Sequence, residues 1–160
     1  MTIDVGDSIP AATLFRLGDD GLEPFEGTDY FKGRKIVLFG LPGAFTPTCS
    51  AQHLPGFVEH ADSFAARGVD AIACISVNDV WVMNAWAKDQ GAEGKVDMLA
   101  DGNGELTRAM GLDADMSARG YGVRSRRYAM LVDDGVVRNL AIEEGAALHV
   151  STAEKMLDAV

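Results

Sequence analysis

The sequence predicts an α/β fold in which a mixed β-sheet is flanked by helices. Three observations support this prediction: two short apolar runs typical of buried strands, helical periodicity in the segments that follow them, and a later hairpin pattern. The chain has 160 residues without a repeat or a linker. This length suits one domain with a sizeable core, spanning 1–160.

The first half of the chain alternates strand and helix. The run KIVLFGL at 35–41 is bounded by a glycine and a proline, as expected of a buried strand. Apolar residues recur at helical spacing over 54–65, and Gly68 can end that helix. A second buried strand, VDAIACISV, follows at 69–77. Asn78 or Asp79 can then cap the next helix, which we expect to run to about residue 88.

The second half adds shorter elements. We expect a strand over 95–100 and a short helix over 103–110. Apolar strands at 128–132 and 136–142 flank an Asp-Gly dipeptide, which is a strong hairpin signal. The string STAE at 151–154 has the pattern of a capping box and predicts a C-terminal helix.

Composition narrows the class of protein. Lys and Arg number 14 against 24 Asp and Glu, which gives a net charge of −10 and disfavours nucleic acid or an anionic membrane as partner. No apolar run approaches the roughly 18 residues of a membrane span, and the N-terminal residues show no secretory signal. The two cysteines suggest neither a disulfide framework nor a metal site. We therefore expect a cytoplasmic protein without a metal.

The decapeptide LPGAFTPTCS at 41–50 begins at the end of the strand predicted at 35–41 and contains a candidate catalytic cysteine. Pro42 stops the strand, Thr46 is a favoured N-cap and Pro47 a favoured first helical residue. Thr48 and Cys49 then lie in the first turn, where free N–H groups and the helix dipole favour an anion. Because the thiolate is the nucleophilic form of cysteine, this position predicts a reactive Cys49.

Two other interpretations stay open from the residues alone. Cysteine is often a small buried apolar residue, which would make the chain a non-catalytic binding module. A cysteine hydrolase would instead pair Cys49 with a histidine, either His53 one helical turn on or His149 from a remote loop.

The pattern Pro42-x-x-x-Thr46-x-x-Cys49 resembles the active-site motif of the peroxiredoxins, which are thiol peroxidases. The longer string PGAFTPTCSAQHLPGFVE is similar to their type II branch, as are ISVND at 75–79 and SRRYAMLVDDG at 125–135. This resemblance implies a thioredoxin-like fold, with a central mixed sheet flanked by helices. It also implies a homodimer without a bound cofactor that reduces hydrogen peroxide and small organic (alkyl) hydroperoxides.

The resemblance also implies roles for the residues of the motif. Cys49 would attack the peroxide and become a sulfenic acid. Thr46 would hydrogen-bond the peroxide, Pro42 would shield the sulfenate, and the backbone N–H groups of Thr48 and Cys49 would bind the substrate. We expect Phe45 to line the mouth of the pocket.

An arginine completes the site in the similar family, and Arg124, Arg126 and Arg127 are the candidates. In type II enzymes this arginine precedes an aromatic residue, here Tyr128, which selects Arg127. Strand alternation places Arg127 on the face of Ala129 and Arg126 on that of Tyr128. For Arg124 we expect a solvated strand end.

Cys74 has two interpretations. It lies within the strand predicted at 69–77, where it can be a core residue, but plant type II relatives carry a cysteine there that is sometimes assigned as the resolving thiol. A disulfide with Cys49 would need the helix start to unfold if the Cα atoms lie more than about 7 Å apart. Val150 replaces the resolving cysteine of the mammalian relative. The resemblance therefore favours reduction of Cys49 by glutathione and glutaredoxin, or by thioredoxin; a peroxide sensor that oxidises a partner protein is the alternative.

Overall fold

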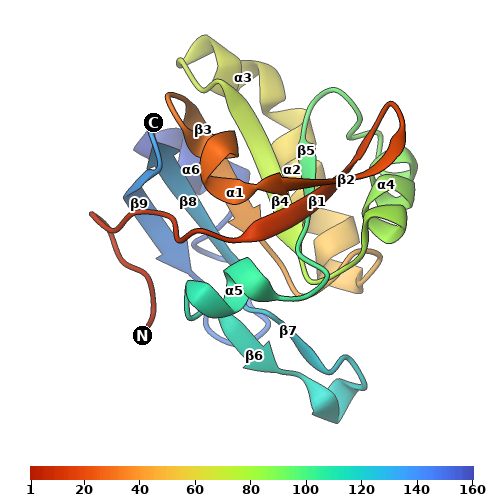
Figure 1. The fold of residues 1–160 in the computed structure, drawn as a ribbon. Helices are drawn as coiled ribbons and strands as arrows, with labels where there is room; N and C mark the ends of the chain where they lie inside the picture. The colour runs from red at the N-terminus through yellow and green to blue at the C-terminus, as the bar shows by residue number, and fades with distance from the viewer.

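The computed structural model describes residues 1–160 and is built around a seven-stranded β-sheet (Figure 1). Its strands are β1 (Thr13–Gly18), β2 (Gly21–Glu26), β3 (Lys35–Gly40), β4 (Ala71–Ser76), β5 (Asp97–Ala100), β8 (Tyr128–Asp133) and β9 (Val136–Ile142). They are ordered β2-β1-β5-β4-β3-β8-β9 across the sheet. β3, β4 and β5 are parallel, whereas the strands on both sides pair antiparallel. The predicted mixed α/β sheet is therefore confirmed.

Helices cover both faces of this sheet (Figure 1). They are α1 (Gly27–Phe31), α2 (Leu54–Glu59), α3 (Ala61–Ala66), α4 (Val80–Asp89), α5 (Glu105–Ala109) and α6 (Ala153–Ala159). α2, α3, α4 and α6 bury their apolar residues against one face, and α1 and α5 against the other. None of these helices is both long and apolar enough to cross a bilayer.

After Lys35, every residue of β3 is apolar because the strand is buried on both faces. Val37 and Phe39 belong to the core cluster under α2 and α4, whereas Ile36 and Leu38 belong to the cluster under α1 and α5. Successive side chains of a strand point to opposite faces, so a strand covered on both faces is apolar at nearly every position. The same holds for Ala71 to Ile75 of β4, which pairs with β3 in parallel.

Two predicted helices differ in detail. The helix expected over 54–65 is divided into α2 and α3, because the backbone leaves the helical conformation at His60 (φ −96°, ψ 11°). The C-terminal helix begins after Thr152, whose hydroxyl accepts a hydrogen bond from the Lys155 N–H at 3.2 Å. Ser151 is therefore not the cap that the STAE pattern suggests, and its side chain bonds to Glu143.

Other predicted features are confirmed closely. Asp79 caps α4 by accepting a hydrogen bond from the Val82 N–H at 2.9 Å. The turn between β8 and β9 has positive φ at both central residues, 48° at Asp134 and 78° at Gly135. Both residues of a type I′ turn require this conformation, which explains the Asp-Gly pair.

Two hairpins are absent from the sequence-based expectations. β1 and β2 carry charged residues and a proline, Pro24, in the outermost strand of the sheet, where a missing N–H is tolerated. The second hairpin consists of β6 (Asp113–Asp115) and β7 (Val123–Ser125), which are short. It projects from the body of the molecule below α5 (Figure 1), and it contributes to the site described next.

Candidate active site

The site begins where β3 ends. After Gly40 the chain makes a turn, and a helix begins at Pro47. The Ser50 N–H donates to the Thr46 carbonyl at 3.0 Å, which is the first bond of that helix. Thr46 is thus the residue before the helix, and Cys49 is its third residue, in the first turn as the sequence predicts. From Cys49 to His53 the helix has π geometry.

The Thr46 hydroxyl does not cap this helix. It donates to the Gly43 carbonyl at 2.7 Å instead of accepting from a first-turn N–H. The N–H groups of Thr48 and Cys49 are thereby left for another acceptor. They point along the helix axis at its positive end, an arrangement that suits an anion or a polarised oxygen.

Cys49 is fully buried and lies beside a cation. The Nη2 atom of Arg127 donates to the Cys49 Sγ at 3.4 Å, and Arg127 itself is only 4% exposed. Arg127 directly precedes β8 and faces the core cluster that contains Ala129, as strand alternation predicts. The contact therefore places a fixed positive charge directly against the sulfur.

Arg127 is held in turn by His53. Its Nη1 atom lies 3.1 Å from Nδ1 of His53, and the Nε2 atom of the same ring lies 2.9 Å from the Ser151 carbonyl. A carbonyl only accepts, so Nε2 carries the hydrogen and Nδ1 accepts from Arg127. Burial, together with the Arg127 charge, lowers the pKa of His53 to about 3. The ring is therefore neutral and orients the guanidinium toward Cys49.

Glu143 fixes the far end of this chain of contacts. It follows β9, is buried, and its Oε2 atom accepts from the N–H groups of His149, Val150 and Ser151 and from the Ser151 hydroxyl, at 2.7–2.8 Å. Burial opposes ionisation of Glu143, but these hydrogen bonds outweigh it and lower its pKa. The anchored loop presents the Ser151 carbonyl to His53.

These contacts argue against the hydrolase interpretation. His53 directs its nitrogens to Arg127 and Ser151, and not to the sulfur. His149 is exposed, and only its backbone N–H takes part in the network. Neither ring is placed to take a proton from Cys49.

A second set of contacts positions the turn itself. The Ala44 N–H donates to Oδ1 of Asn78 at 3.0 Å, and the Ser76 hydroxyl donates to the same atom at 2.6 Å. On the other side of the cysteine, Nε1 of Trp86 donates to the Ser50 hydroxyl at 2.9 Å. These three side chains come from β4, α4 and the segment between them, so the ISVND block supports the site without touching the sulfur.

Arg124 is not the solvated strand end that the sequence suggests. It is half-buried, and its Nε and Nη1 atoms donate to the carbonyls of Tyr121 and Pro42 at 2.9 and 3.3 Å. A Cβ atom at Gly43 would lie 2.8 Å from Nη1 of Arg124. Gly43 therefore allows Arg124 to reach across the turn and hold Pro42 in place.

Phe45 also differs from expectation. It has φ of 66°, a left-handed conformation that non-glycine residues rarely adopt. Its side chain is 52% exposed, and its ring centroid lies 6.5 Å from that of Trp86. The side chain does not line the cavity beside Cys49, because the left-handed backbone turns it toward α4.

That cavity has a volume of about 630 Å³ and opens between the helix start and the β6–β7 hairpin. Pro42, Thr46, Thr48 and Arg127 are among its lining residues. The structure thus brings together four of the predicted site residues on one wall, beside the buried Cys49. No group of three or more His, Cys, Asp or Glu side chains is arranged to hold a metal ion.

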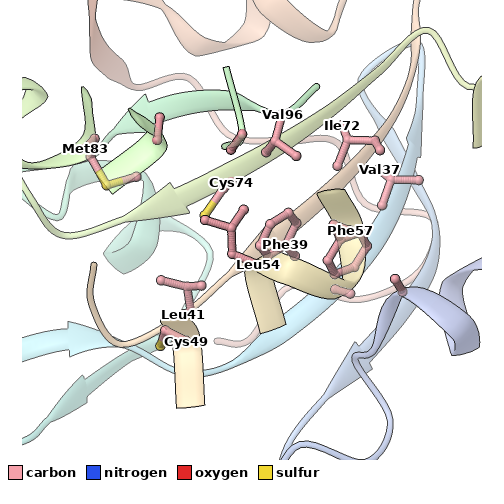
Figure 2. Packing of buried hydrophobic residues seen from close by; sticks show 14 of the residues in the cluster. Val37, Phe39, Leu41, Cys49, Leu54, Phe57, Ile72, Cys74, Met83 and Val96 are labelled. Carbon is pink, nitrogen blue, oxygen red and sulfur yellow. The ribbon is translucent and has the colours of Figure 1, made fainter. Parts of the chain in front are cut away.

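Cys74 lies within β4, fully buried in the same apolar cluster as Cys49. Both thiols are free, and Figure 2 shows their sulfur atoms well apart, with Leu54 beside Cys74 and Leu41 beside Cys49. Burial, with a further electrostatic contribution from Cys49, raises the pKa of the Cys74 thiol well above its usual value. Cys74 is therefore a neutral thiol in this conformation.

Comparison with known proteins agrees with the observed fold. The model of the Redoxin family matches residues 4–157. Chloroplastic peroxiredoxin-2E-2 of Oryza sativa subsp. japonica is 55% identical over 164 residues, which cover 99% of this chain and 73% of the relative. Peroxiredoxin-2B of Arabidopsis thaliana is 45% identical over 159 residues, covering 99% and 98%.

A solved structure is similar over the same length. The crystal structure of reduced Prx3 in complex with H2O2 from Vibrio vulnificus has a TM-score of 0.95 and 47% sequence identity, and the match covers 99% of each chain. The expected thioredoxin-like peroxiredoxin fold is thereby confirmed. The chain belongs to the redoxin family, and within it to the type II peroxiredoxins, which are thiol peroxidases.

Proposed function

We propose that this peroxiredoxin reduces hydrogen peroxide and small organic hydroperoxides, with Cys49 as the reacting group. The observation that carries the proposal is the contact between the buried Arg127 guanidinium and the Cys49 sulfur, next to two first-turn N–H groups without an intrahelical partner. A cation and two donors around one sulfur can stabilise the negative charge of the transition state.

The reaction follows from this geometry. The Cys49 thiolate attacks the terminal peroxide oxygen, so that an S–O bond forms while the O–O bond breaks. The departing oxygen takes up a proton and leaves as water or an alcohol, and Cys49 becomes a sulfenic acid. Negative charge moves from sulfur to the departing oxygen, and Arg127 with the N–H groups of Thr48 and Cys49 can follow it. Thr46 and Pro42 line the cavity, where they can hydrogen-bond the peroxide and shield the sulfenic acid.

For the return to the thiol we propose an external reductant. Glutathione would attack the sulfenic sulfur and release water, and a glutaredoxin thiol would then free Cys49; thioredoxin could supply both thiols. Two features support this order: Cys74 is buried as a neutral thiol, and Val150 is not a cysteine. A neutral thiol is a weak nucleophile, so Cys74 is poorly prepared to attack in this conformation.

We also propose a homodimer and a cytoplasmic location. Phe45 and Trp81 are large apolar residues that are 52% and 59% exposed, as is common at protein interfaces. The cytoplasmic location is proposed because the two cysteines form no disulfide framework, as is usual in a reducing compartment.

Mass spectrometry after one equivalent of hydrogen peroxide tests the function. We expect the wild type to gain one oxygen on Cys49, and to carry a glutathione adduct there when glutathione is added. Cys49→Ser should neither gain the oxygen nor turn over peroxide, whereas Cys74→Ser should do both. Retained turnover in Cys49→Ser would contradict the mechanism, and a Cys49–Cys74 disulfide would contradict external reduction. Oxidation without turnover in the presence of glutaredoxin or thioredoxin would favour the sensor alternative.

A further inference from the structure

The cavity beside Cys49 is much larger than hydrogen peroxide requires. Its volume of about 630 Å³ lies within the range of roughly 300–1,000 Å³ that is usual for pockets binding drug-sized organic ligands. Part of its wall is apolar, made by the β6–β7 hairpin, the loop after β9 and the start of the active-site helix. These residues are Pro47, Ala114, Met116, Ala118, Tyr121 and Ala146. The space can therefore hold an organic chain as well as a peroxide group.

The same cavity is cationic, although the chain as a whole has a net charge of −10. Arg119 and Arg126 line it together with Arg127. The one carboxylate on the wall, Asp115, accepts hydrogen bonds from the N–H and hydroxyl of Ser117. Neither Arg119 nor Arg126 forms an ion pair, since both ion pairs of the structure lie elsewhere.

Arg126 is the better placed of these two cations. It is half-buried, and its backbone is fixed by a hydrogen bond from its N–H to the Leu112 carbonyl at 2.7 Å. Its Nη2 atom makes one long contact, 3.4 Å, with the Glu143 carbonyl. A guanidinium can give two parallel hydrogen bonds to a carboxylate, and most of the donors of Arg126 are unused.

Hydrogen peroxide and simple alkyl hydroperoxides are neutral, so they make no use of a second and a third arginine. We propose that the cavity binds organic hydroperoxides that carry a carboxylate remote from the peroxide group. The carboxylate binds Arg126, with Arg119 at the rim, while the chain lies along the apolar wall and the peroxide reaches Cys49. This inference rests on the proposed peroxidase function and specifies its substrate class.

The test compares one hydroperoxy fatty acid with its methyl ester, in which a methyl group replaces the charge of the carboxylate. The second-order rate of Cys49 oxidation is measured in a single turnover without any thiol reductant, both compounds below their aggregation concentration. We expect the acid to react about tenfold faster than the ester in the wild type, as for one charge-assisted contact. Added salt should lower the rate of the acid only.

Two variants locate the effect. Arg126→Gln should bring the ratio of acid to ester close to one, and Arg119→Gln should lower it less. Arg138→Gln provides the control, because Arg138 is an exposed arginine of β9 that does not line the cavity. Oxidation by hydrogen peroxide should be unchanged in all three variants, which shows that each is folded and reactive.

The outcomes separate this inference from the proposed function. A wild type that hydrogen peroxide oxidises normally, but with an acid-to-ester ratio near one, overturns the inference alone. A high ratio that Arg126→Gln does not change overturns it too, since the carboxylate then binds elsewhere. Glutathione also carries carboxylates. If Arg126→Gln slows only the attack of glutathione on the sulfenic acid, the arginines serve the reductant and the inference is wrong. If no peroxide oxidises Cys49, the proposed function itself fails.

Discussion

The surroundings of the two cysteines differ although both are fully buried in the same core cluster. Cys49 has an arginine on its sulfur and lies at the start of a helix. Cys74 sits within a central strand, paired with Phe39 of β3, and burial dominates its environment. The comparison shows that burial alone does not set the chemistry of a thiol; the charged and polar groups brought to it do.

Removal of the positive charge of Arg127 beside Cys49 should lower peroxidase activity more than any other change considered below. We expect Arg127→Gln to lower kcat/KM for hydrogen peroxide by about 100-fold to 1,000-fold, as for the loss of a principal transition-state donor. Steady-state turnover at several peroxide concentrations measures it. Arg138→Gln serves as the matched control, and equal activity of the two variants would show that the contact with Arg127 is not needed.

Loss of the hydrogen bond between His53 and Arg127, with the arginine kept, should lower the rate of Cys49 oxidation by a smaller factor. In His53→Leu the guanidinium keeps its charge but loses the acceptor that orients it, so we expect a decrease of about tenfold in the rate of Cys49 oxidation. Alkylation of Cys49 at a fixed pH should also slow in His53→Leu, and an amide in His53→Asn should restore part of the oxidation rate. A purely structural role for His53 would leave the alkylation rate unchanged.

The neutral state of His53 should also appear in the stability of the fold. Its folded pKa of about 3 lies below the unfolded value of about 6.5, so the unfolded chain binds the extra proton between these values. The free energy of unfolding should therefore fall as pH decreases from 6.5 toward 3, by at most about 1.4 kcal/mol per pH unit from this group. Urea titrations of wild type and His53→Leu at a series of pH values measure the slope, which the variant should reduce. The low pKa of Glu143 acts in the same direction and stays in both proteins. Equal slopes would contradict a buried neutral ring.

Substitution of Cys74 should change activity and stability least. Cys74→Val replaces one buried apolar side chain by another of similar size, and should change the free energy of unfolding by less than about 1.5 kcal/mol. The rate of Cys49 oxidation by hydrogen peroxide should not change in this variant. A slower oxidation would show that Cys74 acts on Cys49 before any disulfide step.

The parts of the fold that could be predicted are those whose pattern is local. Except at Lys35 and Ser76, β3 and β4 are continuous apolar runs. The turn between β8 and β9 needs positive φ at two residues, and the Asp-Gly pair at 134–135 is typical of that conformation. The β1–β2 hairpin was not predicted, because charged residues and Pro24 mask its period. The position of Cys49 in a first helical turn was likewise encoded within four residues of sequence.

The contacts that hold Arg127 in place could not be predicted from a local pattern. His53 reaches Arg127 and Ser151 across 74 and 98 residues of sequence, and no local pattern reports such contacts. The available signal was the spacing of four between Cys49 and His53, which places both on one helix face. That spacing suggested a catalytic base, whereas the ring is an acceptor that positions the arginine.

The near-complete burial of Arg127 has a consequence for the oxidised protein. While the sulfur is a thiolate, the guanidinium has a counter-ion; a sulfenic acid is neutral and removes it. The cation is then enclosed without compensation, with its Nε atom already lacking a partner, and an unpaired buried charge destabilises its surroundings. We therefore expect oxidation to loosen the helix start around Cys49, which would appear as faster amide hydrogen exchange there when the sulfenic acid forms. A looser helix start would in turn give the reducing thiol access to the sulfenic acid of Cys49.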